Sequence, residues 1–149
     1  MNSFTDFWCF QLGSLTRKIA RMYNSRFNEL GITLGQSFVL FYLMEQDGKG
    51  VKDIASAVQL DSPSVTGLVD RLLKEGLVIR KEDPEDRRSV QVFITPQGRE
   101  IAAAAGMIAI EFNNHLKQSL LMNAEAFERS LSTLNHSIDS FGNAAESKC

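Results

Sequence analysis

Apolar residues recur every three or four positions through most of the chain, which is the spacing of one face of an α-helix. This pattern predicts a long first helix over residues 4–30, with Gly31 as its stop signal. Residues 33–36 (Thr-Leu-Gly-Gln) have the sequence of a capping box and predict a second helix over residues 34–46. The polar and glycine-rich residues 47–50 are then expected to form a turn.

Two shorter helices follow in the middle of the chain. The first is predicted over residues 51–58 and a tight turn over residues 59–61. We expect Ser62 to cap the next helix, with Pro63 as its first residue and Gly76 as its stop. The buried stripe of this helix is predicted to be Val65, Leu68, Val69, Leu72 and Leu73.

The hydrophobic period then changes from about 3.6 to two, which indicates strands over residues 77–82 and 90–95. The polar segment 83–89 between them is too long for a two-residue turn and is expected to project as a loop. Helical spacing returns over residues 96–122 and 124–141.

Two short helices joined by a three-residue turn, followed by a hairpin, form a winged helix-turn-helix. We therefore predict a mainly α, single-domain chain with a small β-hairpin. Its DNA-binding module spans residues 34–95, and helices over 4–30 and 96–141 serve dimerisation.

The terminal helices carry more large apolar side chains than the central module can cover. Burial between two copies in a homodimer would remove them from water and set two recognition helices about 34 Å apart. The alternative is a monomer in which these helices pack on their own module. The residues concerned are Phe4, Phe7, Trp8, Phe10, Phe112, Leu116, Leu120, Leu121, Phe127, Leu131 and Leu134.

Composition fits an ordinary globular protein, because 44% of the 149 residues are apolar and 23% are charged. The net charge of −2 argues against indiscriminate nucleic-acid binding, so positive charge has to be concentrated locally. The two cysteines form no disulfide framework, and we expect a cytoplasmic protein with no membrane span and no signal peptide.

Local positive charge and small polar groups occur at two places. On the helix after residue 61, the residues that point away from the core suit contacts to phosphates or base edges, although any surface helix carries such residues. They are Ser62, Ser64, Thr66, Gly67 and Asp70, with Arg71 and Lys74 at the flank. In the loop, Arg87 and Arg88 could enter a narrow minor groove, and a neighbouring carboxylate could orient them.

The loop sequence 83–89 (Asp-Pro-Glu-Asp-Arg-Arg-Ser), followed by residues 94–98 (Ile-Thr-Pro-Gln-Gly), resembles the wing signature of the MarR (multiple antibiotic resistance regulator) family. Residues 53–55, 62–66 and 73–78 are similar to that family's helix-turn-helix pattern.

The resemblance implies that Arg88 inserts into the minor groove, that Asp86 braces it, and that an obligate homodimer binds a pseudo-palindromic operator. It also implies repression that is relieved by a small aromatic or phenolic acid or by an oxidant. A ligand cleft would draw on Leu12, Thr16, Arg17, Phe38, Phe41, Tyr42 and Met44, although ordinary core packing is an alternative for these residues.

Cys9 and Tyr23, fourteen residues apart, resemble the thiol and tyrosine of the family's organic-hydroperoxide-sensing branch. That branch has further tyrosines where this chain has Gly13 and Leu34, and a buried structural cysteine is the alternative.

We expect no enzymatic activity, because His115 and His136 lie in no catalytic motif and no phosphate-binding glycine loop occurs. Glu111 and His115 share a helix face without an evident third ligand, so neither a metal nor a cofactor is predicted. A winged-helix module that binds protein and not DNA is the alternative function.

Overall fold

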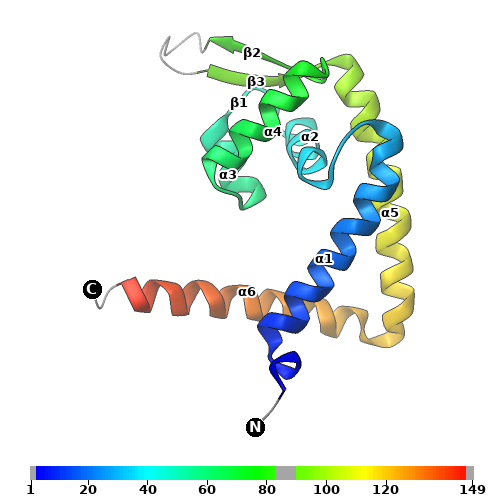
Figure 1. Cartoon of the computed structure of the whole chain (residues 1–149), viewed down its shortest axis with the longest axis vertical. Coiled ribbons are helices and arrows are strands. Elements are labelled where there is room, and N and C mark those ends of the chain that lie inside the picture. The colour runs from blue at the N-terminus through cyan, green and yellow to red at the C-terminus, as the bar shows by residue number, and fades with distance from the viewer. Residues whose placement is uncertain (1–2, 83–89, 147–149) are drawn as a thin grey trace. The chain divides into compact units, whose positions relative to one another are not determined.

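The computed structural model describes residues 3–82 and 90–146, and the side chains up to residue 141. The backbone forms two compact units, residues 1–109 and residues 110–149. The elements of the first unit (Figure 1) are η1 (Phe4–Asp6), α1 (Trp8–Phe27), η2 (Asn28–Leu30), α2 (Leu34–Glu45), β1 (Lys49–Gly50), α3 (Val51–Val58), α4 (Ser62–Lys74), β2 (Val78–Glu82), β3 (Val90–Ile94) and the start of α5 (Pro96–Leu120). The rest of α5, η3 (Leu121–Asn123) and α6 (Ala124–Glu146) belong to the second unit.

The chain has the predicted mainly helical winged-helix architecture, with small differences at the ends of elements. The first helix is shorter than residues 4–30, because one 3₁₀ turn precedes α1 and another follows it. Gly31 then stops the chain in the left-handed conformation, with φ 71°. The last helix runs beyond residue 141 to Glu146.

Two helix starts show how the sequence fixes the module. At α2 the capping box is confirmed, because the Thr33 hydroxyl accepts from the Gln36 amide and the Gln36 side chain accepts from the Thr33 amide. At α4 the prediction that Ser62 is the cap is wrong. Asp61 has the extended cap conformation and accepts from the Ser64 amide, so Ser62 is the first helical residue and Pro63 the second.

The small sheet has three antiparallel strands in the order β1-β3-β2, one more than the predicted hairpin. Residues 49–50, which were predicted as part of a turn, pair with Val92 and Gln91 of β3. Strands β2 and β3 run side by side toward the wing, with Val78 opposite Ile94 and Glu82 opposite Val90 (Figure 1). Residues 83–89 lie outside the described residues.

The hydrophobic core gathers one face of each helix of the module. On α4, Val65, Val69 and Leu72 are fully buried, whereas the predicted Leu68 and Leu73 are partly buried at its edge. Helix α4 packs against both α2 and α3. This burial fixes the rotation of α4 about its own axis.

In the second unit, α6 is exposed along nearly all of its described length. Its apolar residues Phe127, Leu131 and Ile138 are 40%, 43% and 65% exposed. No helix among residues 3–82 and 90–146 has the length and hydropathy required to cross a bilayer.

Glycine is required where the wing strand approaches α5. A Cβ atom added to Gly98 would overlap the backbone carbonyl oxygen of Leu77, whereas one added to Gly67 on α4 would meet only open space. We predict that Gly98→Ala lowers the free energy of unfolding by about 2 kcal/mol through overpacking. Gly67→Ala, its matched control, should raise it by about 0.5–1 kcal/mol through helix propensity.

Chemical denaturation of the two variants beside the parent measures both changes. A Gly98→Ala protein as stable as Gly67→Ala would contradict the close approach of Leu77 to α5.

Candidate nucleic-acid interface

The exposed face of α4 is the surface that the sequence assigned to DNA. Burial of the stripe described above leaves Ser64, Thr66, Asp70, Arg71 and Lys74 exposed, and the remaining two predicted contacts, Ser62 and Gly67, half-buried. The seven predicted residues of this helix therefore lie on one continuous surface.

The amino-terminal end of α4 is already occupied by a carboxylate. Asp61 accepts from the Ser64 amide at 2.8 Å and from the Ser64 hydroxyl at 2.7 Å. The side-chain bond from Ser64, followed by its backbone bond, lowers the pKa of the Asp61 carboxyl, which stays ionised at neutral pH. Since this negative charge already satisfies the helix end, phosphate attraction has to come from basic side chains and not from the helix dipole.

Hydroxyl groups on α4 are also engaged within the helix. The Ser64 hydroxyl donates to Asp61, and the Thr66 hydroxyl donates to the carbonyl oxygen of Ser62 at 2.9 Å. In these rotamers each hydroxyl has already used its one hydrogen, so its oxygen is left as an acceptor. They can accept from the amino groups of adenine or cytosine, and they would have to rotate to donate to a phosphate.

Asp70 has a partner that the sequence did not suggest. Its carboxylate pairs with the Arg80 guanidinium at 2.8 Å and so joins α4 to β2. Arg71 and Lys74, one and four residues further along α4, form no ion pair with any residue in the described part of the chain. They are the basic side chains of this helix that remain available to phosphates.

The strands that carry the wing present further positive charge. Lys81 of β2 lies with its Nζ atom 5.0 Å from the centre of the Phe93 ring on β3, a cation–π contact that orients the ammonium group. The predicted wing-tip residues Asp86, Arg87 and Arg88 lie outside the described residues.

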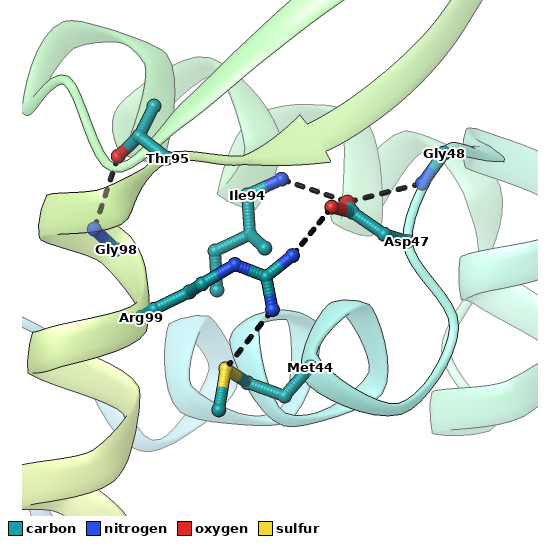
Figure 2. A network of polar contacts seen from close by, with 7 residues as sticks. All are labelled: Met44, Asp47, Gly48, Ile94, Thr95, Gly98 and Arg99. Atoms are coloured by element: carbon teal, nitrogen blue, oxygen red, sulfur yellow. Dashed lines mark hydrogen bonds and ion pairs between the residues drawn. The ribbon is translucent and has the colours of Figure 1, made fainter.

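A polar network fixes the base of these strands (Figure 2). The Asp47 carboxylate accepts from the amides of Gly48 and Ile94 at 3.0 and 2.9 Å and pairs with Arg99 at 2.7 Å. The same guanidinium lies 3.8 Å from the Met44 sulfur. We refer to these five residues as the Asp47 network. It connects the end of α2, strand β3 and the first turn of α5.

Comparison with known proteins agrees with this geometry. Residues 32–90 match the model of the MarR family. The chain is 37% identical over 91 residues to the HTH-type transcriptional regulator TtmR of Methylorubrum extorquens, a match that covers 61% of this chain and 47% of that protein. It is 33% identical over 90 residues to the Organic hydroperoxide resistance transcriptional regulator of Bacillus subtilis, covering 60% of this chain and 61% of that protein. These matches thus span less than two thirds of the relatives' own length.

The solved structures extend the likeness to the whole fold. The S. aureus MepR–DNA complex has a TM-score of 0.81 at 24% identity and covers 91% of this chain and 99% of that chain. A probable transcriptional regulator from Pseudomonas aeruginosa has a TM-score of 0.69 at 28% identity and covers 83% of this chain and 95% of that chain. Residues 32–90, which include most of the winged-helix module, thus have the sequence of a MarR-family domain.

The seven residues predicted to bind an effector are exposed or half-buried in the single chain. Phe41 and Tyr42 pack against the hydrophobic core, as the alternative of ordinary packing expects. Phe38 and Tyr42 line one pocket between α2 and α3. The other five, which do not line this pocket, are Leu12, Thr16, Arg17, Phe41 and Met44.

The predicted redox pair is also separated within one chain. Cys9 and Tyr23 lie on the same helix, and fourteen residues at about 1.5 Å per residue place them roughly 21 Å apart. Cys9 is exposed in the single chain, so a buried structural cysteine at this position would need a second chain to cover it. Burial raises the pKa of the half-buried Tyr23 phenol, which packs against the Phe27 ring. The two side chains could meet only across two chains.

No group of three potential metal-ligating side chains occurs within the parts of the chain that the structure describes. The roles of Asp61, Arg80 and the Asp47 network were not predicted from the sequence. Asp61 carries a local signal, because aspartate three residues before Ser64 is a common cap. The ion pairs of Asp47 and Arg80 join residues far apart in sequence and have no local signal.

The Asp47 network is expected to stabilise the base of the wing strands. Asp47→Ala leaves the Ile94 amide without its acceptor and should lower the free energy of unfolding by about 1–2 kcal/mol. Hydrogen exchange of the Ile94 amide should become about tenfold faster if the base of the strands opens locally by a similar energy.

Asp70→Ala is the matched control, because the Asp70 carboxylate is more exposed than that of Asp47 and its loss should cost less than about 1 kcal/mol. Unchanged exchange at Ile94 in Asp47→Ala would show that this network does not hold the strand.

Proposed function

We propose that this protein is a DNA-binding transcriptional regulator, a cytoplasmic repressor that binds a pseudo-palindromic operator as a homodimer. The observation that carries the proposal is the orientation of α4 within a MarR-family module. Val65, Val69 and Leu72 of its apolar stripe are fully buried, and its polar face lies open beside the wing strands. The relatives TtmR and the B. subtilis protein are named transcriptional regulators. Among the structures of this fold, MepR and CouR were solved with DNA.

In the proposed complex α4 enters the major groove. Ser62, Ser64, Thr66 and Gly67 form the surface nearest the bases, and Gly67 adds no side chain that would hold the helix away from them. Arg71 and Lys74 neutralise phosphates. Asp70 orients Arg80 and so has a supporting role.

The wing supplies the second part of the interface. Arg88, with Arg87 beside it and Asp86 as its brace, would reach the adjacent minor groove, where A·T-rich DNA concentrates negative potential. Support for this comes from the loop sequence and from the strands β2 and β3, which lead directly into it.

Two chains are required for a pseudo-palindromic site. Of the eleven apolar residues predicted at the dimer interface, eight are exposed in the single chain, among them Phe4, Phe7 and Trp8 at 64%, 56% and 67%. Apolar surface of this extent is rare on a monomer. Association of two chains through these terminal segments would remove it from water.

Control by a ligand or an oxidant completes the proposal. A small effector can shift the protein only if it binds one spacing of the two recognition helices more tightly than the other. Oxidation would start from the exposed Cys9 and would require Tyr23 to come from the other chain. We expect no catalytic activity, since the relatives are named as regulators.

DNA binding through phosphates predicts a strong dependence on salt. Genomic fragments captured by the protein serve as the ligand, and their dissociation constant is measured over a series of salt concentrations. Arg88→Ala should lose most of the affinity, whereas Arg71→Ala should weaken binding evenly and reduce the salt slope by about one. Arg129→Ala, which removes the same charge from an exposed pair on α6, is the matched control and should bind like the parent.

A protein-binding winged helix would show no steep salt dependence with any fragment. If Arg88→Ala binds the captured fragments as tightly as Arg129→Ala does, the wing mechanism is wrong.

A further inference from the structure

A pocket of about 370 Å³ lies between the last turns of α2 and the end of α3. This volume is within the range of small-molecule sites. The lining residues are Phe38, Tyr42 and Glu45 of α2 together with Ala57, Val58 and Gln59 at the end of α3.

The α2 wall of the pocket combines two aromatic rings with one carboxylate. Phe38, Tyr42 and Glu45 are spaced by four and three residues, so they lie on one face of the helix. Phe38 is 44% exposed, and Glu45 is the one charged residue among the six that line the pocket. The Glu45 carboxylate makes no ion pair with any described residue, and no basic side chain lines the pocket.

The backbone adds negative potential to that of the Glu45 carboxylate. Helix α2 ends at Glu45 and α3 ends at Val58, so the carboxyl-terminal ends of two helices meet at this pocket. Such ends carry partial negative charge on carbonyl groups that have no partner in the helix. Gln59, which follows α3, adopts the left-handed conformation with φ 55° and contributes its side chain to the lining.

We propose that this pocket binds a small organic cation with an apolar body, such as a quaternary ammonium or phosphonium ion. Aromatic faces and a carboxylate attract such a cation, whereas the Glu45 carboxylate would repel the carboxylate of an aromatic acid. Arg17, which would have held that acid, does not line the pocket. Since α3 packs on α4, a cation that shifted α3 on binding would also shift α4. This consequence for DNA rests on the proposed function, whereas the binding itself does not.

The test uses tetraphenylphosphonium as the probe and tetraphenylborate, which has the same shape and the opposite charge, as its control. Isothermal titration calorimetry on the full chain should show one saturable phosphonium site per chain. Glu45→Gln should weaken phosphonium binding about tenfold and should not weaken borate binding, because it removes a charge that attracts the cation and repels the anion. Phe38→Leu keeps the apolar volume but removes a ring and should also weaken it severalfold. Glu29→Gln, an exposed carboxylate outside the pocket, should match the parent.

Equal phosphonium affinity in Glu45→Gln and the parent would overturn the proposal, as would an equal loss for both ions. The captured DNA fragments separate this result from the proposed function. A parent protein that binds no DNA but binds phosphonium through Glu45 would refute the regulator and retain the cation site.

Discussion

The rotation of α4 about its own axis is the constraint on which the rest of the structure depends. Val65, Val69 and Leu72 are fully buried on one side of this helix, at spacings of four and three residues. Burying three such side chains stabilises this orientation by several kcal/mol at about 1.5–3 kcal/mol each. Any other rotation would expose them. The opposite face, with Ser64, Thr66 and Arg71, is therefore held toward solvent by the core and needs no contacts of its own.

The second requirement is that the wing strands keep a fixed position beside that face. Val78 of β2 and Val92 and Ile94 of β3 are buried in the core and attach the base of the hairpin to the helices. The Asp47 network adds a charge-assisted connection from α2 to β3 and to the first turn of α5. The pair formed by Asp70 and Arg80 connects α4 to β2. These two ion pairs join the helices to β2 and β3 and hold α4 and the strands in one arrangement. A helix and a wing that contact neighbouring grooves of DNA require such a fixed arrangement.

The parts that could be predicted from the sequence are those with local physical causes. The capping box at Thr33, the stop at Gly31 and the buried stripe of α4 depend on residues a few positions apart, so their patterns indicated them correctly. The cap of α4 was assigned to Ser62 because Asp61 and Ser62 are both good caps, and only the backbone conformation distinguishes them. Strand β1 has two residues and no periodicity, and its partners Val92 and Gln91 lie more than forty residues away. Phe38 and Tyr42, which line the pocket beside Glu45, were among the predicted effector residues, but the wall contributed by α3 has no local signal in the sequence. The wing-tip residues Asp86, Arg87 and Arg88 remain predictions.

Hydroxyl-radical footprinting of the protein on a captured genomic fragment tests the central claim most directly, because it reports where the duplex is covered. A homodimer joined through its terminal helices carries two winged-helix modules and should protect two regions of the DNA backbone. The centres of these regions should lie about one helical turn apart, roughly 34 Å along the duplex, with matching patterns on both strands. Protection of a single region, or uniform protection without a repeat, would contradict a two-fold symmetric dimer of winged-helix modules.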